Sequence, residues 1–136
     1  MTDCAGNTAA SGISTTSINI DDDDSPIIGY GGPWAISHFA GFSGGTTHFT
    51  SATGASAAFQ VDEGPVALVM EKAASRGSAK IFVDGVLRAT VSTNSATTRH
   101  RRVVWQALLG PGTHPVMVIG NGTAGHPRID LDAVLD

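Results

Sequence analysis

Four consecutive aspartates, Asp21 to Asp24, precede the first apolar run of this 136-residue chain. Carboxylates at this density repel one another, and Ca²⁺ relieves such repulsion because it takes about 6–8 oxygen ligands. Asp130 and Asp132 would lie beside them if the first and last strands of an antiparallel sheet were neighbours. We therefore predict a structural Ca²⁺ site formed by Asp21, Asp22, Asp130 and Asp132. The alternative is a solvated acidic turn, and the spacing excludes an EF-hand loop.

Aromatic side chains gather in the N-terminal third of the chain, among glycines: Tyr30, Trp34, Phe39 and Phe42. An aromatic ring can stack on the C–H face of a pyranose while polar neighbours bond the hydroxyls. Trp34 follows a Gly-Gly-Pro turn, and turns of a sandwich present side chains to solvent. We predict that Tyr30 and Trp34 form the stacking face of a sugar site. The alternative is that both rings pack at the end of the core.

Three cations are candidates for the polar half of that site. Lys72, Arg76 and Arg102 could donate hydrogen bonds to sugar hydroxyls, or to a carboxylate if the sugar is acidic, since the fork of arginine suits a bidentate contact. Arg102 ends a basic run, Arg-His-Arg-Arg at 99–102, whose strand alternation predicts Arg99 and Arg101 on one face. The alternative is a strand end whose cations pair with Asp or Glu.

Charge and hydropathy exclude two classes of partner. The formal net charge is −4, so no basic field attracts nucleic acid, and we expect no nucleic-acid partner. No apolar run approaches the ~20 residues that a spanning helix needs, and we expect no membrane insertion.

The residues do not predict an enzyme. The five histidines show no metal-ligand spacing, and the Gly-Phe-Ser-Gly-Gly run at 41–45 is interpreted as a turn and not as a nucleophile elbow. Asp62 and Glu63 lie in a turn, and Glu71 is expected to pair with Lys72 or Arg76. We therefore predict no catalytic residue.

The composition predicts that β-strands and turns, not helices, carry these candidate residues. Charged residues make up only 15%, there are 17 glycines, and short β-rich runs alternate with turns. Ala55, Ala57, Phe59 and Val61 alternate with more polar or smaller residues, so they should face a core. This pattern predicts an all-β, antiparallel β-sandwich of jelly-roll type, with strands over residues 27–30, 34–37, 46–50, 55–61, 66–71, 78–83, 86–93, 100–107, 114–119 and 128–134.

One hairpin is predicted in detail. Asp84-Gly85 separates two β-rich runs, and this dipeptide favours a two-residue type I′ turn because both positions accept positive φ. Such a turn pairs Val83 with Val86 and Phe82 with Leu87.

From residue 44 to residue 105 the chain resembles a β-sandwich module that recurs, often in tandem, in secreted and surface proteins of actinobacteria. The matching segments are Gly-Gly-Thr-Thr-His-Phe (44–49), Gly-Ala-Ser-Ala-Ala-Phe (54–59), Ser-Arg-Gly-Ser-Ala-Lys-Ile-Phe-Val-Asp-Gly (75–85) and Arg-Val-Val-Trp (102–105), with further matches at 112–114 and 129–133. The module is galactose-binding-domain-like and similar to many carbohydrate-binding modules. The resemblance implies that fold, and related modules often hold Ca²⁺ between the first and last strands.

Taken together, these observations predict a β-sandwich domain over residues 18–136 after a flexible tail or linker over residues 1–17, which contains Cys4. We predict a non-catalytic carbohydrate-binding module of a secreted or surface protein, hence an extracellular location. The alternative is a structural or interaction β-sandwich, such as a phage capsid-decoration or tail component or an adhesin spacer, which would act in a virion or on a surface through protein partners.

Overall fold

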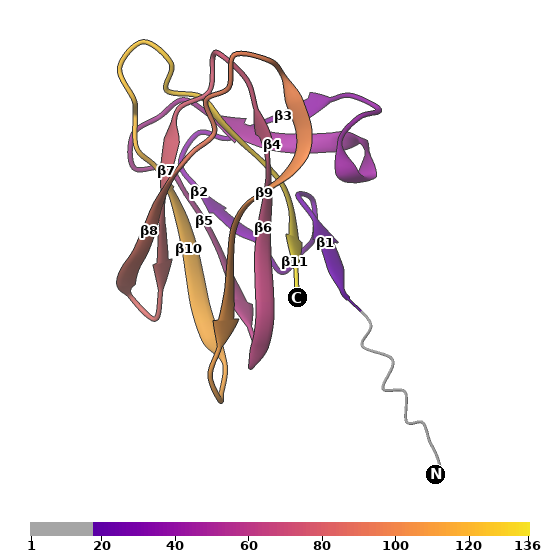
Figure 1. Ribbon diagram of the computed structural model, residues 1–136, viewed down its shortest axis with the longest axis vertical. Helices are drawn as coiled ribbons and strands as arrows, with labels where there is room; N and C mark the ends of the chain where they lie inside the picture. The colour runs from indigo at the N-terminus through magenta and orange to yellow at the C-terminus, as the bar shows by residue number, and fades with distance from the viewer. Residues whose placement is uncertain (1–17) are drawn as a thin grey trace.

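A computed structural model describes residues 18–136 of the protein. The predicted tail, residues 1–17, lies outside the described residues. Two antiparallel sheets pack face to face (Figure 1), so the predicted all-β jelly-roll sandwich is confirmed. In the described range the sole helical element is a short 3-10 turn, η1 (Ser43–Gly45). Between residues 18 and 136, no helix has the length and apolar character needed to cross a membrane.

The first sheet has six strands, and its main path runs in the order β3 (Ala35–His38), β4 (Thr46–Thr50), β11 (Ile129–Leu135), β6 (Gly64–Lys72) and β9 (Arg99–Leu109). The sixth strand, β1 (Ile20–Asp22), also pairs with β11. The second sheet has the order β2 (Gly29–Gly31), β5 (Ser56–Val61), β10 (His114–Gly120), β7 (Ser78–Val83) and β8 (Val86–Ser92).

The last strand organises the first sheet. β11 pairs with β6 along one edge, and along its other edge it pairs first with β4 and then with β1. The first and last strands are therefore neighbours, which the predicted calcium site requires. Asp21 and Asp22 nevertheless belong to β1 itself, opposite Val134 and Ala133, rather than to a turn before the first strand.

The core lies between the sheets. Ala55, Ala57, Phe59 and Val61 are all buried, as predicted. Cross-strand partners in an antiparallel sheet point to the same side, and one inward row of the second sheet runs through Tyr30, Ala57, Val118, Ile81 and Ala89.

The predicted hairpin joins β7 to β8. Asp84 and Gly85 have φ of 54° and 78°, and the pairs Val83 with Val86 and Phe82 with Leu87 are both present. Beyond them the register shifts, since Ile81 faces Ala89. The shift is a β-bulge that the sequence did not reveal.

Candidate functional site

The start of β9 departs from regular strand geometry. Arg99 faces Lys72 and Arg102 faces Met70, so β9 has two residues, His100 and Arg101, where β6 has only Glu71. Arg101 takes the extra position with a φ of 54°. A bulge of this kind re-aims the side chains around it, and the regular alternation predicted for residues 99–102 is therefore wrong.

The loop between β3 and β4 packs against this bulge. The Phe39 ring is 51% exposed, and its centroid lies 4.8 Å from that of His100. Arg101 donates from Nε to the carbonyl oxygen of Gly41 at 2.8 Å. A side chain at Gly41 would collide with the Phe39 ring, so glycine at this position allows the loop to close on β9.

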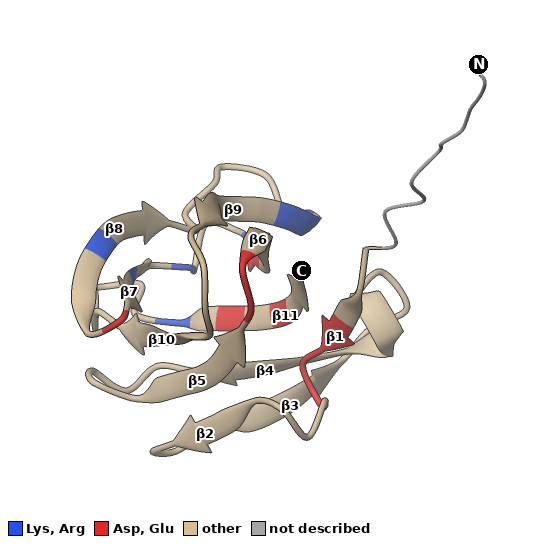
Figure 2. Cartoon of the chain, turned by 90° about the horizontal axis from the view of Figure 1, so that it is seen from below, with Lys and Arg blue, Asp and Glu red and all other residues tan. Residues whose placement is uncertain are grey.

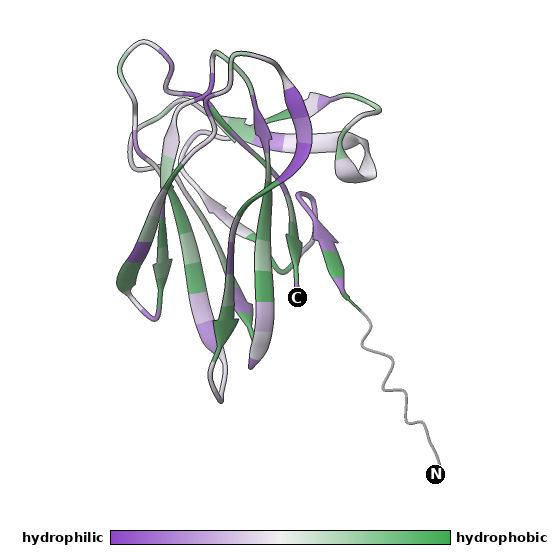
Figure 3. Cartoon of the chain, viewed as in Figure 1, coloured by the Kyte–Doolittle hydropathy of each residue, from purple (hydrophilic) through white to green (hydrophobic). Residues whose placement is uncertain are grey.

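The bulge and the loop bring six residues to the start of β9, which is an edge strand of the first sheet. We call this region the basic corner. His100, Arg101 and the neighbouring Phe39 lie on the side of the sheet to which Glu71 points, whereas Lys72, Arg99 and Arg102 share the side of Met70. Figure 2 shows the blue segment at the start of β9, and Figure 3 shows that β9 changes from hydrophilic there to hydrophobic at its other end. The three arginines are exposed and Lys72 is partly exposed. The corner is thus an exposed aromatic ring that has Arg101 on its own side of the sheet and three further cations around the edge of β9.

Within residues 18–136, the four Lys and Arg side chains of the basic corner form no ion pair. The alternative in which the basic run pairs with acids applies only to His100, whose Nδ1 lies 2.7 Å from Glu71 Oε2. The role of Lys72 and Arg102 as ligand donors therefore remains a prediction. Phe39, Arg99 and Arg101 are further candidates for the site. They were not predicted as ligand residues, because the bulge at the start of β9 has no sequence signature.

Arg76, a predicted ligand donor, is placed differently. Its guanidinium is buried, with Nη2 donating to Glu71 Oε1 at 2.6 Å and Nε 2.7 Å from Asp130 Oδ1. Arg128 donates to both oxygens of Asp130 and lies 3.8 Å from the centroid of the Phe49 ring. Arg76 therefore balances two buried carboxylates, and we do not assign it to the ligand site.

Tyr30 and Trp34 are also engaged within the fold. The Tyr30 ring stacks on His48 at 4.1 Å with an interplanar angle of 5°, and its hydroxyl donates to the carbonyl oxygen of Asp23 at 2.6 Å. Burial and the nearby Asp23 and Asp24 raise the pKa of Tyr30, so the hydroxyl stays protonated. Trp34 is half-buried against Tyr30 and donates from Nε1 to the carbonyl oxygen of Gly31. These contacts support core packing, and the basic corner lies elsewhere.

Two of the four predicted calcium ligands converge. Ser43 donates its backbone N–H to Asp132 at 2.9 Å and its hydroxyl to Asp22 at 2.5 Å. Burial raises the pKa of Asp132 to about 6, with further contributions from the charges of Asp23 and Asp22. The red segments of β1 and β11 in Figure 2 mark these strands. The arrangement concentrates negative charge at one place.

The other two predicted ligands do not join them. Asp130 accepts hydrogen bonds from Thr47 and Arg128, and Asp21 accepts hydrogen bonds from Asn19 and Ser25. No group of three or more His, Cys, Asp or Glu side chains within residues 18–136 is arranged to hold a metal ion. The four residues therefore do not fit a single calcium site as predicted.

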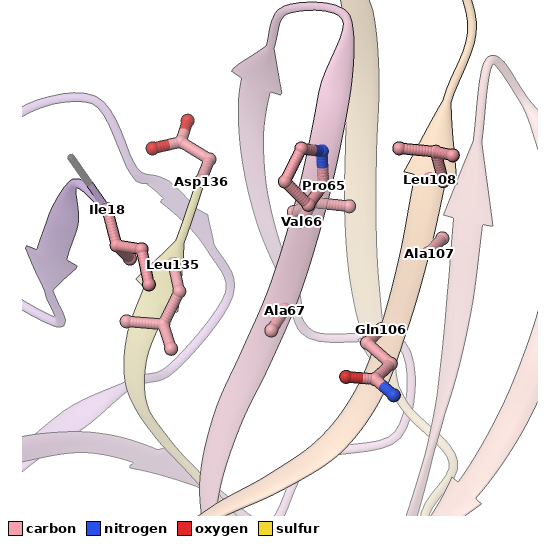
Figure 4. A pocket seen from close by; sticks show the side chains of 9 residues that line it. All are labelled: Ile18, Pro65, Val66, Ala67, Gln106, Ala107, Leu108, Leu135 and Asp136. Atoms are coloured by element: carbon pink, nitrogen blue, oxygen red, sulfur yellow. The ribbon is translucent and has the colours of Figure 1, made fainter. Parts of the chain in front are cut away.

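An apolar groove lies on the first sheet, away from the basic corner (Figure 4). Its volume is about 470 Å³, and it is lined by Ile18, Pro65, Val66, Ala67, Gln106, Ala107, Leu108, Leu135 and Asp136. Ile18 and Leu108 are 68% and 79% exposed. Its walls are almost entirely aliphatic, so it offers contact area with few hydrogen-bonding groups.

Neither a protein-family model nor a curated protein matches the sequence. Solved structures do match the fold. The CBM36-1 domain of a multidomain xylanase from the hindgut metagenome of Trinervitermes trinervoides is 9% identical with a TM-score of 0.62, over 88% of this chain and 95% of that domain.

Two enzymes contain a similar sandwich. The Agl-KA catalytic domain is 15% identical with a TM-score of 0.62, over 89% of this chain. An exo-beta-1,3-galactanase from Phanerochaete chrysosporium, solved with beta-1,3-galactotriose, is 20% identical with a TM-score of 0.61, over 90% of this chain. This chain spans only 27% and 30% of those two chains. The comparisons establish a β-sandwich like that of a carbohydrate-binding module.

Proposed function

We propose that this chain is a carbohydrate-binding domain without catalytic activity, part of a secreted or surface protein and hence extracellular. The observation that carries the proposal is the basic corner, which presents the half-exposed Phe39 ring on the same side as Arg101, with further exposed arginines around the edge of β9. A sugar site needs an apolar plate with polar groups converging on it. The similarity of the fold to the CBM36-1 domain over 95% of that domain supports the same conclusion.

The environment of the buried carboxylates supports a binding role over hydrolysis. Glycoside hydrolysis needs two carboxyl groups that reach the substrate, one of them a general acid with a raised pKa. Glu71 and Asp130 are held by arginines. Asp132 has a raised pKa but is fully buried, so it cannot contact a polymer in solution.

A glycan array, followed by affinity electrophoresis and product analysis, tests the proposal. We expect retention of the protein by at least one polysaccharide without release of smaller sugars. Phe39→Ala should weaken that retention while the melting temperature changes little, because the ring is half-exposed. Absence of binding to every neutral and acidic glycan on a broad array would refute the proposal, and release of oligosaccharides would refute its non-catalytic part.

We also propose that Ca²⁺ binds near Asp22 and Asp132. The convergence of these carboxylates on Ser43 and the raised pKa of Asp132 support this proposal, since a cation would offset the repulsion that contributes to that shift. With fewer protein ligands than were predicted, such a site would depend on backbone and water oxygens.

The apolar groove favours a second candidate function, protein assembly on a surface or in a virion. Exposed aliphatic patches on soluble domains often mark protein contacts. This alternative predicts a species heavier than the 13.9 kDa monomer in native mass measurements, and Leu108→Glu should remove it. A monomer at all concentrations, or a complex that survives Leu108→Glu, would count against a role for the groove in self-assembly.

A further inference from the structure

The basic corner concentrates positive charge in an acidic chain. It holds Lys72, Arg99, Arg101 and Arg102, four of the eight Lys and Arg residues of a protein whose formal net charge is −4. Arg76 and Arg128, in contrast, are neutralised by Glu71 and Asp130. Like charges on adjacent strands repel one another unless an opposite charge lies between them. Such a corner is therefore suited to an anionic ligand.

The backbone conformation and one hydrogen bond fix the position of Arg101. Arg101 has a φ of 54° at the bulge, a conformation that L-residues other than Asn and Asp rarely adopt. Its Nε donates to the carbonyl of Gly41, and its two terminal nitrogens donate to no other residue in the range 18–136. Asp132 is near enough for the charge of Arg101 to offset part of the rise in its pKa, but the two side chains form no ion pair, so the terminal edge of the guanidinium can still bind a carboxylate or sulfate of a ligand.

The spacing of the cations suits a polymer. Arg99 and Arg102 are three positions apart, which is at most about 10 Å along an extended strand. One small anion cannot contact both ends of such a row, whereas successive charged units of a chain can. Phe39 adds an apolar plate on the side of the strand where His100 and Arg101 lie, and a sugar ring can cover it.

We propose that the basic corner binds an anionic polysaccharide, one that carries uronate carboxylates or sulfate esters. Arg99 and Arg101 bind the anionic groups, and Phe39 stacks on a sugar ring. This inference rests on the proposed carbohydrate-binding function and names the ligand class of the same site. Nucleic acid is less suitable, because the overall charge is negative and Phe39 is the only exposed ring at the corner.

Binding to matched polymers tests the proposal. The probes are polygalacturonate and its fully methyl-esterified form, and dextran sulfate and unmodified dextran, so that each pair shares one backbone. We expect the protein to bind one of the charged polymers at least about tenfold more tightly than its neutral counterpart, and the affinity to fall as salt is raised. The pair that responds tells whether the recognised group is a carboxylate or a sulfate.

Variants locate the site. The double variant Arg99→Gln/Arg101→Gln should lose at least about tenfold in affinity. The control is Lys80→Gln/Arg88→Gln, which removes the same charge from the second sheet and should bind as wild type does. If the first variant melts at a lower temperature, Lys72→Gln/Arg102→Gln provides an independent test at the other side of the same strand edge.

The outcomes separate this inference from the proposed function. Equal binding to the charged and neutral member of each pair, or binding to neutral glycans alone, overturns the inference and keeps the carbohydrate-binding function. Binding to no polysaccharide overturns both. Equal losses in the two double variants, or tighter binding to a DNA duplex than to either charged polymer in the same buffer, also overturn the inference.

Discussion

Arg76 is buried, and its guanidinium lies between the carboxylates of Glu71 and Asp130. From the sequence alone, this cation is predicted to lie in the ligand site. The residues around position 76 do not predict its contact with Asp130, which lies 54 positions later in the sequence. The pairing of β11 with β4 and β6 brings Asp130 into place. Burial of an ionic group depends on such distant partners, and a single sequence does not reveal them.

Replacing Arg76 should therefore destabilise the fold strongly. Arg76→Met leaves two buried carboxylates with less compensation, and losing one partner of a buried pair typically costs about 3–5 kcal/mol. Urea unfolding measures this change. The matched control is the exposed Arg102→Met, for which we expect less than about 0.5 kcal/mol. Similar small effects in both variants would show that Arg76 does not balance the buried acids.

Asp132 should give the protein an unusual dependence on pH. Its folded-state pKa is about 6, compared with 3.8 for the free side chain. Above pH 6 it is ionised in both states, and its buried charge opposes folding. As the pH falls from about 6 toward 4, the folded protein takes up this proton before the unfolded chain does, so the contribution of Asp132 to stability rises.

Asp132→Asn provides the comparison, since an amide oxygen can still accept from the Ser43 N–H. Melting temperatures measured in chelator should be higher for the variant near pH 7, and the advantage should shrink or reverse near pH 4. A difference between the two proteins that does not vary with pH would contradict the raised pKa.

At the scale of elements, the β7–β8 turn owes its shape to Gly85. Its φ is 78°, and a Cβ there would meet no atom within 4 Å, so Gly85→Ala introduces backbone strain without a clash. We expect a loss of about 1 kcal/mol in unfolding free energy. Asp84→Asn keeps a residue tolerant of positive φ and an oxygen that can accept from His114 Nδ1, so it should cost less in the same denaturant titration. A neutral Gly85→Ala would mean that the turn relaxes.

Turn chemistry made several elements predictable. The bounds predicted for residues 46–50 and 78–83 agree with β4 and β7, because glycine turns or β-rich composition delimit them. β1 was not predicted, since Asp is depleted in strands and only the partner β11 gives Asp21 and Asp22 their conformation. The bulge at Arg101 was not predicted for a related reason: its extra residue is defined only by the register of β9 against β6.

At the scale of the whole molecule, the calcium proposal predicts a ligand-dependent stability. Binding to the folded state alone adds about 1 kcal/mol at a Ca²⁺ concentration a few times the Kd, which raises Tm by roughly 4 °C for a domain of this size. We expect this rise between excess chelator and millimolar Ca²⁺.

Asp22→Asn should abolish the rise, whereas Asp62→Asn, at an exposed turn on the far side of β5, should preserve it. The same Tm for the wild type in chelator and in Ca²⁺ would contradict the proposed calcium site.

The pairing of β1 with β11 also determines how the domain would respond to tension. Asn19 and Asp136 exchange backbone hydrogen bonds of 2.8 and 3.0 Å, and the next pairs follow inward from them. A force applied at residues 18 and 136 would therefore peel β1 from β11 one pair at a time, instead of shearing all pairs at once. Opened in this way, the first sheet would lose β1, and with it the Asp22 contact to Ser43, which belongs to the same loop as Phe39 and Gly41. Tension at the two ends would therefore loosen the loop of the basic corner first, since of the two carboxylates that Ser43 binds only Asp132 would remain, while β6 and β9 remain paired.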